Sequence, residues 1–194
     1  MENKKQHTTG EDWMKSDEDL IRACIKENRE AQGLLYKKYA NKMFAVCMRY
    51  CNSREEAEDV LQDGFIKVFD KISKYRGDGS FEGWIRTIMV NTSLRSWDKR
   101  AMKFEPGNID DIAEPAVDEK VLSNIGAKDI MDMLARLPEG YKVVFNLFAI
   151  EGYSHKEIGE ILNVNESTSR SQYARARQSL IKMLEKVESK AKAS

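Results

Sequence analysis

Three arginines close together near the C-terminus could contact nucleic acid. Arg170, Arg175 and Arg177 lie in the stretch NVNESTSRSQYARARQSL, residues 163–180, which also contains several hydroxyl side chains. A guanidinium group can donate two parallel hydrogen bonds to the major-groove edge of guanine. Hydroxyls and backbone amides at a helix start, such as those of Thr168, can bind a phosphate. The stretch therefore favours DNA recognition over its alternative, an ordinary solvated face of an amphipathic helix.

Two helices would have to position these arginines. The segment YSHKEIGEILNV, residues 153–164, predicts a short helix that Ser154 caps and Glu157 completes as a capping box. Asn163, Val164 and Asn165 form the predicted turn, and Asn165 also caps the second helix. The expected buried residues are Ile158, Ile161 and Leu162 in the first helix and Tyr173, Ala176, Leu180, Met183, Leu184 and Val187 in the second. A short helix, a tight turn and an arginine-bearing helix indicate a helix-turn-helix DNA reader.

The rest of the chain also has the periodicity of helices rather than of strands. Helices are expected over residues 17–27 and 29–50, after Ser53, from Phe81, from about residue 128, and from Pro138 to Gly152. Capping boxes are also expected for Ser16 with Asp19 and for Ser53 with Glu56. The expected core residues are Leu20, Ile21, Cys24, Ile25, Leu35, Tyr39, Met43, Val46, Tyr50, Leu61, Phe65, Val68, Ile72, Trp84, Ile85, Ile88 and Leu94.

An acidic segment with Pro106, Gly107 and Pro115 interrupts the helical pattern. We therefore predict an all-α protein of two small helical domains joined by a flexible acidic linker. The expected ranges are a disordered arm at 1–15, a first domain at 16–104, the linker at 105–127, a helix-turn-helix domain at 128–187 and a tail at 188–194.

Composition limits the possible functions. The 194 residues carry no formal net charge, whereas a free-standing DNA binder usually has a basic excess. We expect DNA binding to need a partner. The polar start resembles no signal peptide, and no apolar run approaches the roughly 20 residues of a membrane span. We expect a cytoplasmic protein with no direct membrane insertion.

Cysteine spacing argues against a metal site or a cofactor. Cys24, Cys47 and Cys51 form no CxxC pair, and the only histidines are His7 and His155. Buried thiols are the better interpretation. A thiol hydrolase would need a histidine beside a cysteine, and the predicted helices place none there. A conventional regulator with only the helix-turn-helix is the other alternative, but it leaves the motifs described next unexplained.

Three further stretches resemble bacterial RNA polymerase sigma factors. They are AEDVLQDGFIKVF (57–69), FEGWIRTIMVNTSLRSWDKR (81–100) and LPEGYKVVFNLFAIEGYSHKEIGEIL (137–162). The resemblance is to the extracytoplasmic-function (ECF) group, which has only the second and fourth sigma domains, and it covers residues 17–184. It implies a non-enzymatic, stress- or signal-responsive promoter-specificity factor. Its implied partners are core RNA polymerase (the β′ clamp helices and the β flap), promoter DNA and an anti-sigma factor.

The resemblance also implies which residues of the first domain act. The β′ clamp helices would contact Asp59, Gln62, Asp63 and Ile66. Acids at the start of this helix could instead merely complement the helix dipole, but that does not account for Gln62 and Asp63. The minus-10 element would contact Tyr75, Arg76, Asp78, Ser80, Asn91, Arg95, Lys99 and Arg100.

Some of these first-domain positions remain open. Trp84 could be a core residue or a stacking platform, and Asn91 could contact DNA or support its helix. Arg95 stands where many members have an acid, and Trp97 stands where an aliphatic residue is usual.

The implied minus-35 contacts are Thr168, Arg170, Ser171, Ala174, Arg175 and Arg177. We expect Arg170 to read a base edge, Arg175 to reach the next base or a phosphate, and Arg177 to bind the backbone or pair with an acid of its own domain. Ala174 replaces a larger residue of some members. Ser169 replaces the usual Val, which leaves the start of this helix open.

Overall fold

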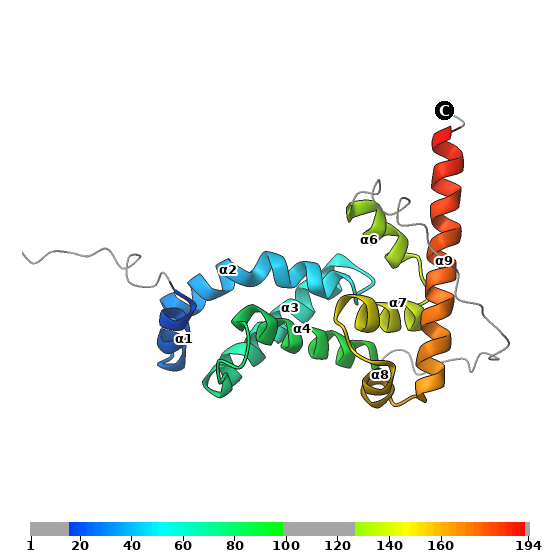
Figure 1. The fold of residues 1–194 in the computed structure, drawn as a ribbon. Coiled ribbons are helices and arrows are strands. Elements are labelled where there is room, and N and C mark those ends of the chain that lie inside the picture. The colour runs from blue at the N-terminus through cyan, green and yellow to red at the C-terminus, as the bar shows by residue number, and fades with distance from the viewer. Residues whose placement is uncertain (1–15, 99–126, 193–194) are drawn as a thin grey trace, which may run out of the picture. The chain divides into compact units, whose positions relative to one another are not determined.

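The computed structural model describes residues 16–98 and 127–192, with only the backbone described for a few residues at the helix ends. Every described element is helical (Figure 1), and the predicted all-α fold is confirmed. The chain divides at Asp98 into two compact units. The first contains α1 (Asp17–Ile25), α2 (Arg29–Met48), α3 (Arg54–Lys71), the 3-10 helix η1 (Ile72–Lys74) and α4 (Phe81–Asp98). The second contains α6 (Ala127–Ala135), α7 (Glu139–Phe145), the π-helix η2 (Asn146–Ile150), α8 (His155–Leu162) and α9 (Glu166–Lys192).

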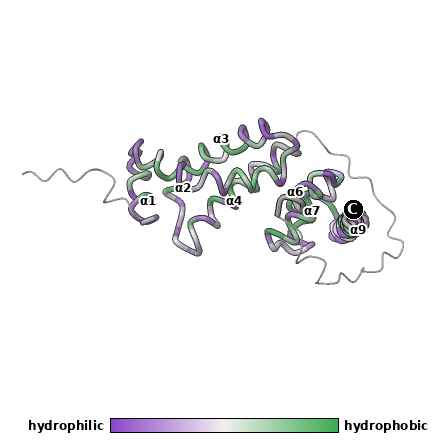
Figure 2. The backbone as a smooth tube through the Cα atoms, turned by 90° about the horizontal axis from the view of Figure 1, so that it is seen from above, coloured by the Kyte–Doolittle hydropathy of each residue, from purple (hydrophilic) through white to green (hydrophobic). Residues whose placement is uncertain are grey.

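The first unit is built on mutual packing of α2, α3 and α4, with α1 against α2. Hydrophilic and hydrophobic residues alternate along these helices (Figure 2), and the apolar ones meet in the core. Every predicted core residue of α2 and α3 is buried. At Gly64 of α3, a Cβ atom would collide with the sulfur of the buried Met89 of α4. The missing side chain therefore allows the two helices to approach closely.

The second unit packs α9 against α7 and α8. Leu134, Leu137 and Ala176 form a buried cluster that partly buried side chains of α7 and α9 surround. Pro138 is the N-cap of α7, one residue before the predicted first turn. Gly152, with φ of +80°, ends the π-helical extension of α7 as predicted. Within the described ranges, no helix has the length and apolarity needed to cross a membrane.

Several predicted boundaries and core residues are wrong. Helix α1 ends at Ile25, not Glu27, because Glu27 has a φ of 57° and the Asn28 amide donates back to the Ala23 carbonyl. Helix α2 ends at Met48 instead of Tyr50.

Three residues of the predicted apolar stripes are exposed: Ile25 by 46%, Ile161 by 38% and Val187 by 52%. Ile25 lies at the end of α1, and Val187 lies in the C-terminal turns of α9, which run past the other helices of the unit (Figure 1).

Candidate nucleic-acid and polymerase interfaces

The turn between α8 and α9 is fixed by backbone geometry. Ser154 and Glu157 form the predicted capping box at the start of α8, with the Ser154 amide donating to Glu157 Oε2 at 2.8 Å. Asn163 ends the helix in the left-handed region, with φ of 53°, and the Val164 amide donates to the Gly159 carbonyl at 2.9 Å. A Cβ atom at Gly159 would lie 2.8 Å from the Val164 carbonyl oxygen. Only a glycine fits this turn without a backbone shift.

The N-terminal half of α9 packs against its unit through buried polar residues and the Tyr173 ring, which contacts Phe148 at 4.5 Å between centroids. Ser169 and Gln172 are buried beside the apolar Ala176. Ser169 Oγ lies 2.9 Å from Nδ1 of the buried His155 in α8. The His155 ring stacks on Phe148 at 4.2 Å between centroids and 8° between planes. Burial and the nearby Arg170 guanidinium lower the pKa of His155, against the opposing effect of Glu166, so the neutral ring is favoured.

Sequence reasoning missed the buried positions of Ser169 and Gln172 because it searched for apolar side chains. The available signal was the spacing: Ser169 precedes Gln172 by three residues, and Gln172 precedes Ala176 by four, so the three share one face of the helix. It also left the start of α9 open at Ser169, which instead lies within the first turns of a regular helix.

The predicted minus-35 residues lie on the outward face and flanks of α9. Arg170 is exposed and donates from a terminal guanidinium nitrogen to Glu166 Oε1 at 2.5 Å. Ser171, Ala174 and Arg175 are half-buried, and Ser171 Oγ donates to the Thr168 carbonyl at 3.0 Å.

Arg177 lies two turns after Arg170, on the same side of α9, and is half-buried. Its guanidinium carbon is 5.9 Å from the centroid of the Tyr173 ring. Arg177 therefore packs on an aromatic ring of its own unit.

The loop before α4, residues 75–80, packs its Tyr75 ring against two aromatic side chains at the start of α4. The Tyr75 hydroxyl donates to the Gly79 carbonyl at 2.6 Å, and its ring packs at 5.0 Å from Phe81 and 5.6 Å from Trp84. Ser80 Oγ accepts from the Gly83 amide in the first turn of α4. Trp84 is half-buried and stacks on Phe81. Tyr75 and Ser80 therefore shape the loop.

The other predicted minus-10 residues that the structure describes are exposed. Arg76 and Asp78 lie in this loop, while Asn91 and Arg95 lie one turn apart on α4. Lys99 and Arg100 are outside the described residues. The described part of the site thus combines cations, an acid and an amide on neighbouring elements.

The predicted polymerase residues all lie on the exposed side of α3. Asp59, Gln62 and Asp63 are exposed polar residues, and Ile66, exposed by 59%, is the apolar residue among them. The opposite side of α3 carries buried residues such as Phe65 and Val68. The predicted polymerase residues therefore form one exposed surface with a single apolar side chain among polar groups.

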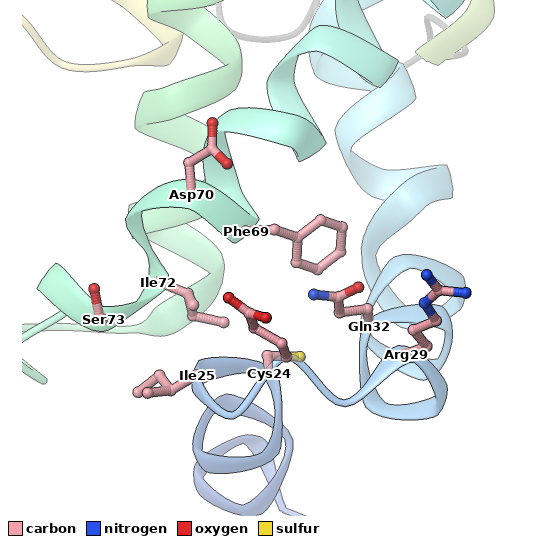
Figure 3. A pocket seen from close by; sticks show the side chains of 9 residues that line it. Cys24, Ile25, Arg29, Gln32, Phe69, Asp70, Ile72 and Ser73 are labelled. Carbon is pink, nitrogen blue, oxygen red and sulfur yellow. The ribbon is translucent and has the colours of Figure 1, made fainter.

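A hollow of about 510 Å³ lies elsewhere in the first unit, and none of the predicted site residues lines it. It is bordered by α1, α2, the end of α3 and η1, with the Phe69 ring close to Gln32 and with Ile25 and Ile72 on the other side of the view (Figure 3). Burial raises the pKa of the Cys24 thiol there to about 11, so the thiol stays protonated and is a poor nucleophile. Among the described residues, no cluster of three metal-ligating side chains occurs.

A helix-turn-helix unit, joined in one chain to a second helical unit, is the arrangement of a DNA-binding protein. Comparison with known proteins gives the family. The description "Sigma-70 region 2" matches residues 35–102, and "Sigma-70, region 4" matches residues 127–180.

The ECF RNA polymerase sigma-E factor of Haemophilus influenzae is 30% identical over 84% of this chain and 92% of its own. The ECF RNA polymerase sigma factor SigE of Mycolicibacterium smegmatis is 32% identical over 89% of this chain and 71% of its own. Among solved structures, the sigma factor RpoE of Bartonella quintana, in complex with the anti-sigma factor NepR, is 18% identical over 79% of this chain and 96% of its own, with a TM-score of 0.48.

The chain belongs to the ECF group of sigma-70 factors. It is a promoter-specificity factor for transcription initiation, which binds core RNA polymerase and promoter DNA and is not an enzyme.

Proposed function

We propose that the two units divide promoter recognition between them. The predicted domain at 128–187 binds the minus-35 element, and the predicted domain at 16–104 binds core polymerase and the minus-10 element. The observation that carries the proposal is the arrangement of α9: Ser169, Gln172 and Ala176 seat the helix, and the arginine-bearing side is left outward.

On α9, Arg170 reads a base edge. It is the most N-terminal arginine of the helix, and the N-terminal residues of a recognition helix enter the major groove. Arg175 lies five residues later, about 140° around the helix at about 100° per residue, so it makes a different contact, with the next base or a flanking phosphate. Ser171 and Ala174 lie between them along the helix, and Thr168 lies two residues before Arg170. Arg177, packed on Tyr173, contacts the DNA backbone.

The exposed side of α3 binds the β′ clamp helices through Asp59, Gln62, Asp63 and Ile66. Ile66 supplies apolar area at the centre, and the carboxylates and amide surround it as a polar rim. Their exposure leaves these side chains available to a partner. The β flap of the polymerase is the second proposed contact of the chain.

The loop before α4, with α4 itself, contacts the minus-10 element. Exposed Arg76, Asp78, Asn91 and Arg95 are the direct contacts, together with Lys99 and Arg100. Tyr75 and Ser80 act through the shape of the loop, because their hydroxyls are bonded within it. In the sigma-factor resemblance, one base of this element is flipped out of the stack and captured. Extruding a base costs a few kcal/mol, which contacts to the captured base must return.

The protein works in the cytoplasm, where it responds to a signal or stress under an anti-sigma factor. Membership of the ECF group supports this regulation. Core RNA polymerase, which the chain binds, is the reason for the cytoplasmic assignment.

The test is selection of randomised minus-35 sequences by holoenzyme containing each of two variants. Arg170→Ala should flatten the preference at one position, because a bidentate arginine contact contributes about 1–3 kcal/mol of base discrimination. Arg177→Ala should lower transcription about equally on all promoters. An unchanged base preference with Arg170→Ala would refute the proposed reading of the helix.

A further inference from the structure

The first turn of α9 contains an acidic residue that the proposed function does not use. Glu166 is the first residue of the helix, and its Oε1 accepts a hydrogen bond from the guanidinium of Arg170, one turn later. Both side chains are exposed. At about 100° per residue they lie about 40° apart around the helix. A carboxylate and the proposed base-reading arginine therefore reach out from α9 side by side.

Helix stability alone is a weak reason for a carboxylate at this place. An exposed ion pair one turn apart contributes little, although an acid in a first turn does complement the helix dipole. Against this, the N-terminal end of a recognition helix enters the major groove between two rows of phosphates. A carboxylate there is repelled unless it meets a hydrogen-bond donor. In the major groove, the base donors are the amino groups of cytosine and adenine.

We propose that Glu166 is a specificity-determining residue of minus-35 recognition, acting together with Arg170. This proposal rests on the proposed function of α9. The bond to Glu166 occupies one N–H of a guanidinium that has five, so enough donors remain for the O6 and N7 atoms of guanine. Oε2 of Glu166 has no hydrogen-bond partner among the described residues. It can accept from the amino group of cytosine or adenine in the adjacent base pair.

The pair would also reject incorrect DNA. A carboxylate facing the O4 of thymine or the O6 of guanine places two acceptors together, which leaves buried groups without partners. Glu166 also offsets the charge of Arg170, so the arginine is less attracted to phosphates of any sequence. Specificity would then increase while non-specific affinity decreases.

The experiment compares holoenzymes containing the parent, Glu166→Ala and Glu166→Gln in selection from randomised minus-35 sequences. Glu166→Ala should lose a preference of about tenfold for cytosine or adenine at the position adjacent to the one that Arg170 reads. It should also transcribe less selectively and bind unrelated duplex DNA more tightly. Glu166→Gln should shift the preference toward adenine, because the amide can bond to both N6 and N7 of that base.

Glu185→Ala is the matched control, because Glu185 is an exposed glutamate of the same helix, far from its N-terminus. It removes the same charge and should leave the base preference as in the parent. If Glu166→Ala keeps the parent's preferences while Arg170→Ala flattens its own position, the inference about Glu166 is wrong and the proposed function stands. If Arg170→Ala also changes nothing, the proposed function itself is wrong.

Discussion

The hydrogen bond between His155 and Ser169 should make the helix-turn-helix sensitive to acid. Both residues are buried, and the bond joins α8 to the N-terminal half of α9. Replacing Ser169 with Ala leaves a buried ring nitrogen without its partner. Such a loss typically costs about 1–3 kcal/mol, so Ser169→Ala should destabilise this unit by that amount at neutral pH.

The direction of the pH effect follows from the lowered pKa of His155. Burial and Arg170 disfavour the charged ring in the folded unit, whereas the unfolded chain has an ordinary histidine pKa of about 6.5. The unfolded state therefore binds the proton more readily. The contribution of His155 to stability is complete above about pH 6.5 and is lost as the pH falls through that value toward the lowered pKa.

Amide hydrogen exchange of the full chain, followed by peptide, is the appropriate measurement. Tryptophan fluorescence does not report on this unit, because Trp13, Trp84 and Trp97 all precede residue 99. Peptides from α8 and the start of α9 should lose protection as the pH falls below about 6.5, the ordinary histidine pKa.

The matched variant for this measurement is His155→Asn. Its amide can replace the ring nitrogen beside Ser169 but does not titrate, and it gives up the stacking on Phe148. We expect lower protection at every pH and a flat profile. Equal pH dependence in the parent and in His155→Asn would refute the reasoning, as would a parent profile that is flat over the same range.

Two further substitutions test the turn and the polymerase face. Gly159→Ala should destabilise the helix-turn-helix, because the new Cβ would lie 2.8 Å from the Val164 carbonyl oxygen. The steric cost is about 1–3 kcal/mol, from which about 1 kcal/mol of gained helix propensity is subtracted. Chemical denaturation followed by exchange of α8 peptides measures the change, and a more stable variant would contradict it. Asp63→Lys should weaken binding to core polymerase without unfolding the chain, because Asp63 is exposed; pull-down with core polymerase equal to that of the parent would show that this side of α3 is not the contact.

The sequence predicts the helices well because their signals are local. Ser16, Ser53 and Ser154 each accept from the backbone amide three residues later, as their spacing to an acid indicates. For Ser53, however, the Glu56 carboxylate accepts from the Asn52 amide, one residue before the cap. A local pattern therefore predicts that a helix begins, and the exact partner depends on the chain that enters it.

Which apolar residues are buried was less predictable. Periodicity identifies the apolar side of a helix, but it does not show how far along that side the neighbouring helices extend. Val187 continues the apolar stripe of α9 and is nevertheless exposed by 52%, because no described helix covers those turns. Buried polar residues are missed for the opposite reason. Ser169 and His155 satisfy each other, and that pairing joins residues 14 positions apart, which no local pattern contains.

The buried hydrogen bond between Ser169 and His155 limits how α9 can present its arginines to DNA. A helix packed only through apolar side chains can rotate slightly about its axis, because dispersion contacts have little directional preference. A hydrogen bond is directional and weakens steeply when it is bent, so the bond from Ser169 to His155 restricts the rotation of the first turns of α9. Arg170 follows Ser169 directly in the chain, and Glu166 holds its side chain from the preceding turn. The Ser169 bond therefore restricts the backbone of the proposed base-reading residue, whereas the exposed pair with Glu166 only favours one position of its side chain. We expect that loss of the Ser169 bond would weaken the base preference at the minus-35 element. Loss of the Glu166 bond would instead change which bases are preferred.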